Sequence, residues 1–117
     1  MLFVCYPKCT TCQKALRFLE ERGIDVAIRN IKDECPALNE LREWHARSGL
    51  PLRRFFNTSG IQYRALGLKD KLDSMSEEEQ LALLASDGML VKRPLLVGED
   101  FVLVGFRPQE WEAQLAR

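Results

Sequence analysis

Cys9 and Cys12 are the residues of this sequence best suited to carry chemistry, because two residues separate them and a helix is predicted to begin at this point. One turn at a helix start brings cysteines with this spacing within disulfide reach. The free N–H groups and positive dipole end of a helix also favour a thiolate, and can lower a cysteine pKa from about 8.5 to roughly 3.5–7.5. The pattern therefore predicts a redox or nucleophilic cysteine site.

The two sulfurs are not expected to be equivalent. Apolar positions recur at the helical spacing i, i+3, i+4 and i+7, namely Cys12, Ala15, Leu16 and Leu19. Cys12 should therefore point inward. Cys9 precedes this face, in the loop that enters the helix, and is predicted to be the exposed attacking sulfur. Lys8 adds a positive charge that also favours the thiolate.

The other cysteines and the single histidine offer weaker chemistry. A zinc site would need two ligands besides the C-x-x-C pair, and Cys5, Cys35 and His45 lack the paired spacing of such sites. Cys5 lies in a predicted buried strand and Cys35 in a loop, so both are expected to be inert. His45, on an amphipathic helix, is expected at the edge of the core. We predict thiol chemistry and no bound metal.

Composition limits the class of protein. The 117 residues, 46% of them hydrophobic, are enough for a single domain with a core, here expected to span residues 1–117. The 17 basic and 17 acidic residues cancel, which argues against direct nucleic-acid binding. No apolar run is long enough for a membrane helix and no secretory signal is visible. We expect a cytoplasmic monomer, where cysteines stay reduced.

The first elements predicted are a strand, a helix and a strand. Residues 2–6 are apolar throughout, as in a strand covered on both faces, and a helix over 10–22 follows and ends at Gly23. Apolar residues then alternate over 24–31, which predicts a second strand. A β-α-β unit of this length has parallel strands and a right-handed crossover.

The rest of the chain predicts a helical insertion followed by a hairpin. Residues 36–91 have helical patterns, including a capping box from Ser76 to Glu79 and a helix closed by Gly88. Strands at 95–97 and 101–104 flank a turn-rich spacer, and Pro108 opens a last helix that runs to Arg117. The predicted class is α/β, with a four-stranded mixed sheet in the order β-α-β, helical insertion, β-β-α.

This order, together with C-x-x-C at the first helix start and Arg93-Pro94 before the third strand, resembles a thioredoxin-like fold. Five stretches carry a closer resemblance to the ArsC/Spx family of arsenate-reductase-like proteins: YPKCTTC at 6–12, FFNTSG at 55–60, KDK at 69–71, VKRPLL at 91–96 and VGF at 104–106. The resemblance covers essentially the whole chain.

The resemblance assigns roles to several residues. It implies that Cys9 is the nucleophile and that Cys12 is a resolving thiol, although reductases of the family can lack a cysteine there and use an external thiol. It implies that Pro94 is a cis proline facing Cys9, and that Arg93 holds a thiolate or oxyanion. Arg107 matches an arginine that arsenate reductases use for the oxyanion, but it also suits a loop.

One position departs from the arsenate reductases. Where they carry a further arginine in the helical insertion, this chain has Asn57, with Arg53, Arg54 and Arg64 nearby but out of register. An arsenate dianion needs several charged donors, so weak arsenate activity is expected. We expect four residues to contact substrate besides the cysteines and Arg93, namely Lys8, Asn57, Pro94 and Arg107.

The resemblance thus implies a thiol-dependent oxidoreductase acting on arsenate or on a glutathione or protein disulfide. No metal or organic cofactor is implied, and glutathione or a glutaredoxin- or thioredoxin-type protein would serve as reductant. The alternative is an Spx-type regulator, whose C-x-x-C senses oxidation and whose surface binds RNA polymerase. The same motif serves both functions, so it does not separate them.

Overall fold

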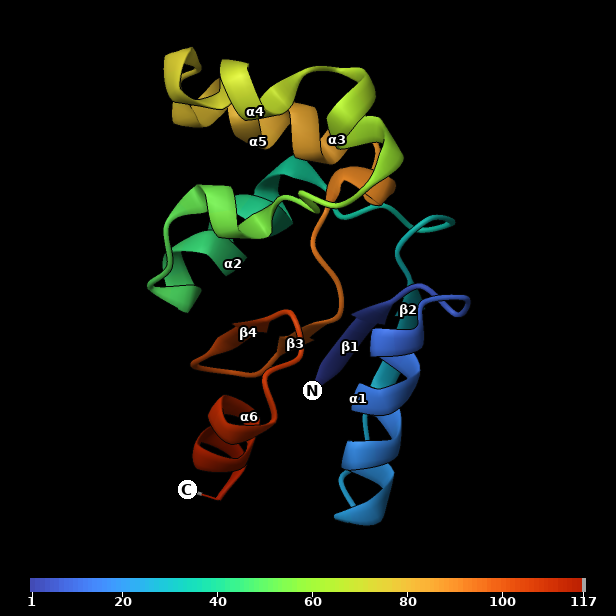
Figure 1. Ribbon diagram of the computed structural model, residues 1–117. Helices are drawn as coiled ribbons and strands as arrows, with labels where there is room; N and C mark the ends of the chain where they lie inside the picture. Colours follow the sequence, from blue (N-terminus) through green and yellow to red (C-terminus); the bar gives the residue numbers. More distant parts are fainter. Residues whose placement is uncertain (117) are drawn as a thin grey trace.

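The computed structural model describes residues 1–116 as a four-stranded sheet layer and a separate layer of helices (Figure 1). The elements of the sheet layer are β1 (Leu2–Cys5), α1 (Thr10–Glu21), β2 (Ala27–Asn30), β3 (Leu95–Val97), β4 (Val102–Val104) and α6 (Pro108–Leu115). The elements of the helical layer are α2 (Leu38–Ser48), η1 (Leu52–Phe55), α3 (Ile61–Ala65), α4 (Leu68–Lys71), η2 (Leu72–Ser74), α5 (Glu77–Ser86) and η3 (Gly88–Leu90).

The sheet is mixed, with strand order β2-β1-β3-β4. β1 runs parallel to β2 and antiparallel to β3, and β3 and β4 form an antiparallel hairpin. In the hairpin turn, the Gly98 N–H donates to the Phe101 carbonyl at 2.9 Å. The predicted fold class, with β-α-β followed by helices and β-β-α, is confirmed.

Alternating side chains of the sheet build two separate cores, one on each face. Phe3 faces α1 and α6, where it meets Trp111 edge-on with ring centroids 6.4 Å apart. Val4 faces the helical layer and joins its core. The apolar face of α1 is buried as predicted, through Cys12, Ala15 and Leu19. Because both cores are anchored on β1, the C-x-x-C helix is held firmly against the sheet.

Local signals explain how the helical layer is formed. The Ser76 hydroxyl accepts from the Glu79 N–H at 3.1 Å and the Glu79 carboxylate accepts from the Ser76 N–H at 3.0 Å, so the predicted capping box is present at the start of α5.

Arg29 of β2 binds the carboxylate of Glu40 in α2 through two hydrogen bonds of 3.0 and 2.9 Å. This pair links the sheet layer to the helical layer.

Two predictions about element boundaries are wrong. The second strand begins at Ala27 rather than at 24, because the Ile24 N–H still bonds to the Leu19 carbonyl of α1 at 3.0 Å. Ile28, in the middle of this strand, is 59% exposed, because β2 is an edge strand.

Gly88 does not close α5, which ends at Ser86. It begins η3 instead, and a Cβ at this position would lie 2.0 Å from the Ile31 carbonyl oxygen. The glycine is needed for this close approach between the layers.

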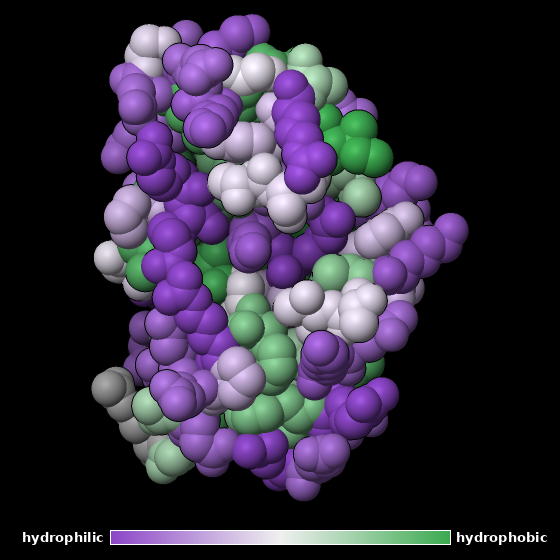
Figure 2. Space-filling view, viewed as in Figure 1, coloured by the Kyte–Doolittle hydropathy of each residue, from purple (hydrophilic) through white to green (hydrophobic). Residues whose placement is uncertain are grey.

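The last helix opens at Pro108 as predicted and is described as far as Leu115, while Arg117 lies outside the described residues. None of the helices within residues 1–116 has the length and apolar character needed to cross a bilayer. The face shown in Figure 2 is mainly hydrophilic, and hydrophilic side chains gather across its middle, between the two layers.

Candidate active site

Cys9 lies at the N-terminus of α1, where the chain turns from β1 into the helix. The Cys9 N–H donates to the Tyr6 carbonyl at 2.9 Å, and its own carbonyl accepts the first helical hydrogen bond, from Gln13 at 3.1 Å. The backbone of Cys9 is extended, with φ −85° and ψ 120°. The half-buried side chain is therefore held at the end of the helix where backbone N–H groups are unpaired.

The pKa of the Cys9 thiol is lowered from its ordinary value. Burial is the largest single influence and raises the pKa, but it is outweighed by several groups that stabilise the thiolate together. These are the backbone N–H and the thiol of Cys12, the backbone N–H of Thr11 and the positive charge of Arg93. Cys9 is thus prepared to act as a nucleophile.

The environment of Cys12 disfavours the thiolate. It is only 2% exposed, and its sulfur accepts a hydrogen bond from the Tyr6 N–H at 3.4 Å. Burial, and to a smaller extent a negative charge on Cys9, raise the pKa of Cys12 to about 12. Both cysteines are free thiols here, so Cys12 stays protonated beside the Cys9 thiolate.

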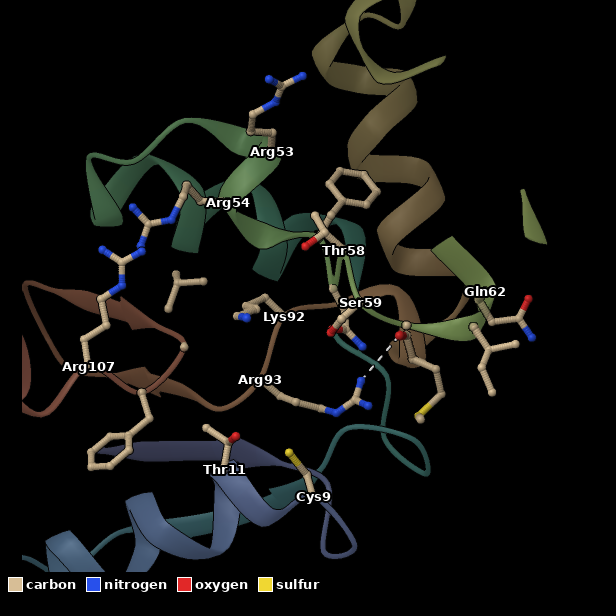
Figure 3. Close-up of a pocket in the computed structure, with 18 residues that line it drawn as sticks. Cys9, Thr11, Arg53, Arg54, Thr58, Ser59, Gln62, Lys92, Arg93 and Arg107 are labelled. Atoms are coloured by element: carbon tan, nitrogen blue, oxygen red, sulfur yellow. Dashed lines mark hydrogen bonds between the residues drawn. The ribbon is translucent and has the colours of Figure 1, made fainter. Parts of the chain in front are cut away.

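Cys9 opens into a cleft of about 820 Å³ between the sheet layer and the helical layer (Figure 3). Four of the residues predicted to form the site line this cleft, namely Cys9, Asn57, Arg93 and Arg107. Cys12 and Pro94 are buried and do not line it. Lys8 is exposed, lies outside the cleft lining and is not among the groups that lower the Cys9 pKa.

The cleft is strongly basic although the chain has no net charge. Five cations line it, namely Arg53, Arg54, Lys92, Arg93 and Arg107, and no acidic side chain lines it within residues 1–116. Arg53 pairs with Asp73 at 2.5 Å, and Arg107 contacts Glu110 at 3.4 Å, both outside the lining. The remaining positive charge favours an anionic ligand next to the Cys9 thiolate.

Arg93 connects the cleft to the nucleophile. Its Nη1 donates to the Met89 carbonyl at 3.4 Å, and its guanidinium carbon lies 5.4 Å from the centre of the Tyr6 ring. The Arg93 Nε is buried and has no hydrogen-bond partner among the described residues. The peptide bond from Arg93 to Pro94 is cis, as the resemblance implied. Arg93 makes no ion pair with the described residues, so its positive charge is available to a thiolate or an anion.

Asn57 lies in the wall of the cleft, but its side chain is held by its own turn. Its Oδ1 accepts from the Ser59 hydroxyl at 3.3 Å, and a Cβ at Gly60 would lie 2.7 Å from its Nδ2. The backbone N–H of Asn57 donates to the Leu90 carbonyl at 2.8 Å. Asn57 thus shapes the turn that forms this wall and presents no charge to the cleft.

The lining of the cleft does not include Cys5, Cys35 or His45. Burial raises the pKa of Cys5 and of Cys35, which makes both poor nucleophiles. His45 packs edge-on against Phe55 with centroids 5.8 Å apart, at the edge of the core. No cluster of metal-ligating side chains occurs within the described part of the chain.

Sequence reasoning gave no role to several residues that line the cleft. Lys92 and Thr11 lie within the motifs that carry the resemblance, and Arg54 lies near Asn57 but out of register with the arginine of the arsenate reductases. A basic residue beside Arg93 was a usable signal for Lys92. Arg54 had no such signal, because its direction depends on how η1 packs over the sheet layer.

The mixed sheet and the helix that begins at the C-x-x-C motif together define a thioredoxin-like fold. The chain belongs to the ArsC family, whose model matches residues 5–114. It is 50% identical over 116 residues to the uncharacterized protein YusI of Bacillus subtilis, covering 99% of this chain and 98% of that protein.

Solved structures agree with this family. A protein described as ArsC family related, from Bacteroides fragilis, has a TM-score of 0.94 and 56% identity, with 96% of this chain and 94% of that one covered. A possible arsenate reductase from Streptococcus mutans has a TM-score of 0.86 and 48% identity, with 95% and 96% covered. More distant matches include the global transcriptional regulator Spx of Listeria monocytogenes, 29% identical over 95% of this chain and 83% of its own length. A glutaredoxin from Archaeoglobus fulgidus, 14% identical with a TM-score of 0.50, shares only the fold.

Proposed function

We propose that this ArsC family protein is a cytoplasmic thiol–disulfide oxidoreductase with Cys9 as its nucleophile. The observation that carries the proposal is the contrast between the two thiols. The pKa of Cys9 is lowered and that of Cys12 is raised to about 12. Cys9 is therefore the attacking thiolate, and Cys12 remains a protonated thiol until the second step. The basic cleft above Cys9 supports an anionic substrate.

In the first step the Cys9 thiolate attacks one sulfur of a substrate disulfide. A bond forms between Cys9 and that sulfur, the substrate S–S bond breaks, and the other substrate sulfur leaves as a thiolate. Arg93, which lowers the Cys9 pKa, is placed to stabilise negative charge during this exchange.

In the second step Cys12 resolves the mixed disulfide. Once Cys9 is bonded, it no longer carries the negative charge that raises the pKa of Cys12. Cys12 can then pass its proton to the departing thiolate and attack Cys9, which releases the second substrate thiol and forms a Cys9–Cys12 disulfide. Glutathione or a glutaredoxin- or thioredoxin-type protein supplies the two electrons that restore both thiols. No metal or organic cofactor takes part.

A turnover assay tests this proposal. A glutathionylated peptide and arsenate are each supplied with glutathione or with thioredoxin as the reductant, and product thiol or arsenite is measured. We expect turnover of the peptide disulfide and little reduction of arsenate. Failure to reduce any disulfide with either reductant would refute the proposal.

We expect little arsenate reduction because Asn57 stands where arsenate reductases carry an arginine. The variant Asn57→Arg tests this expectation. One oxyanion donor is typically worth about 10²–10³ in rate. The variant should therefore raise arsenate reduction by about that factor and change disulfide exchange much less. Arg64→Gln is the matched control, because Arg64 is an exposed residue of α3 that does not line the cleft. Efficient arsenate reduction by the unmodified protein would show that another cation of the cleft replaces the missing arginine.

The similarity to Spx favours a second candidate, a redox-sensing regulator that binds RNA polymerase. In that case the C-x-x-C pair would change its redox state without rapid turnover. A pull-down with the polymerase alpha subunit separates the two functions. Retention of the subunit by the oxidised protein, together with no disulfide turnover, would favour the regulator.

A further inference from the structure

The cleft extends well beyond the reach of Cys9, and its far end carries a second group of cations. In Figure 3, Arg93 points toward Cys9, whereas Arg54 and Arg107 point toward one another from opposite walls. Arg54 comes from η1 of the helical layer and Arg107 from the loop between β4 and α6. The two arginines thus converge from segments far apart in the sequence.

The convergence is not explained by ion pairs within the protein. Arg54 is half-buried and makes no ion pair with residues 1–116, and the contact of Arg107 with Glu110 is long, at 3.4 Å between exposed side chains. Lys92 adds a third charge to the same cleft, and its Cε lies 3.1 Å from the Cβ position of Gly105. Like charges that face one another in a partly enclosed cleft repel, so an anion between them would relieve the repulsion.

The size of the cleft indicates which kind of ligand bears this anionic group. A volume of about 820 Å³ is within the range of roughly 300–1,000 Å³ of small-molecule sites, and far exceeds what one tetrahedral oxyanion fills. A ligand whose sulfur contacts Cys9 could therefore extend along the cleft to the two arginines. A small molecule suits this hollow better than the flat contact typical of two protein surfaces.

We propose that Arg54 and Arg107, assisted by Lys92, bind an anionic group that the substrate carries away from its sulfur. The preferred substrate is then a small disulfide whose thiol bears carboxylate or phosphate groups. This inference rests on the proposed function and names its substrate class. Arg93 acts at the sulfur, and the distant arginines recognise the rest of the molecule.

The experiment compares two disulfides that differ in charge. Oxidised glutathione carries free carboxylates, and its tetraethyl ester has the same skeleton with those carboxylates capped. In the Cys12→Ser protein, the mixed disulfide on Cys9 accumulates, and its rate of formation is followed by mass spectrometry of quenched samples. The ratio of the two rate constants measures recognition of the anion and cancels the intrinsic reactivity of Cys9.

We expect the acid to react faster than the ester, and expect Arg54→Gln and Arg107→Gln each to lower the acid rate about tenfold, as loss of one charged hydrogen bond does. The ester rate should stay within about twofold, which also reports that each variant is folded. Arg64→Gln, outside the cleft, should leave the ratio unchanged. A coenzyme A disulfide, tested alongside, distinguishes phosphate from carboxylate as the preferred group.

An acid-to-ester ratio that is the same in the wild type, Arg54→Gln and Arg107→Gln would overturn this inference and leave the reactivity of Cys9 intact. Exchange confined to a protein disulfide, with no reaction of either glutathione compound, would overturn it as well. The absence of reaction with every disulfide, including the glutathionylated peptide, would instead refute the proposed function.

Discussion

The two walls of the cleft are built in different ways. The sheet-layer wall carries Cys9 at the start of α1, a helix whose buried face packs on the central strand. The wall from the helical layer includes η1, the turn around Asn57 and parts of the short helices α3 and η3. In the first wall, the local geometry of one helical turn sets the position of the nucleophile. In the second wall, the positions of the lining residues depend on long-range packing. We infer that the chemistry resides in the sheet layer, whereas substrate choice draws on both layers, through Arg54 of η1 and Arg107 of the loop after β4.

The largest expected effect is that of removing the nucleophile. Cys9→Ser replaces a thiolate with a weakly acidic hydroxyl, so exchange with any disulfide should fall by more than about 10³-fold. Cys12→Ser is the matched control, because it keeps Cys9 and should still form one mixed disulfide. Both are measured by trapping the adduct with excess disulfide and identifying the modified residue by mass spectrometry. Adducts on Cys5, Cys12 or Cys35 in the Cys9→Ser protein, formed at the wild-type rate, would contradict the assignment.

A smaller effect is expected from replacing Arg93, because this residue changes the rate through the fraction of Cys9 that is present as thiolate. The positive charge lowers the Cys9 pKa, so Arg93→Gln should raise it and reduce the thiolate fraction at neutral pH. Alkylation by iodoacetamide should slow by a few-fold at pH 7, since Arg93 is the smallest of the groups that lower this pKa, and should recover as the pH rises above the new pKa. Arg93→Lys keeps the charge and should retain most of the wild-type profile.

The same measurement can contradict the role of Arg93. An unshifted pH profile for Arg93→Gln, with a uniform drop in rate, would mean that Arg93 only shapes the cleft. At high pH the variant should match or exceed the wild type, since a thiolate of higher pKa is intrinsically more nucleophilic.

The sequence predicted the sheet-layer wall better than the helical wall, for a physical reason. Cys9 and Cys12 are three positions apart, so helical geometry alone separates an outward sulfur from an inward one. The end of the helix at Gly23 and the capping box at Ser76 are equally local signals. These predictions needed no knowledge of the tertiary structure.

The helical wall could not be predicted in this way. Whether Arg54 enters the cleft depends on how η1 packs over the sheet layer, and Asn57 is held by the turn that follows. The error at Gly88 has the same origin. Gly88 is required by its close approach to the Ile31 carbonyl, which belongs to a segment far away in the sequence.

The smallest expected effect tests whether the helical layer can be destabilised without changing the pKa of Cys9 in the opposite wall. Ser76→Ala removes the hydroxyl that caps α5 and should lower the free energy of unfolding by about 1 kcal/mol. Ser86→Ala, at the other end of α5, removes only a hydroxyl that bonds to the Leu83 carbonyl, and should change stability by less than about 0.5 kcal/mol. Urea unfolding measures both changes.

The capping variant should leave the pH dependence of Cys9 alkylation unchanged. The groups that lower the Cys9 pKa are Cys12, Thr11 and Arg93, and none of them belongs to α5. The nucleophile would thus keep its thiolate while the layer opposite it is weakened. A shift of the alkylation profile in Ser76→Ala, with Ser86→Ala unchanged, would show that the helical layer sets the position of Arg93. In that case the reactivity of Cys9 could not be assigned to the sheet layer alone.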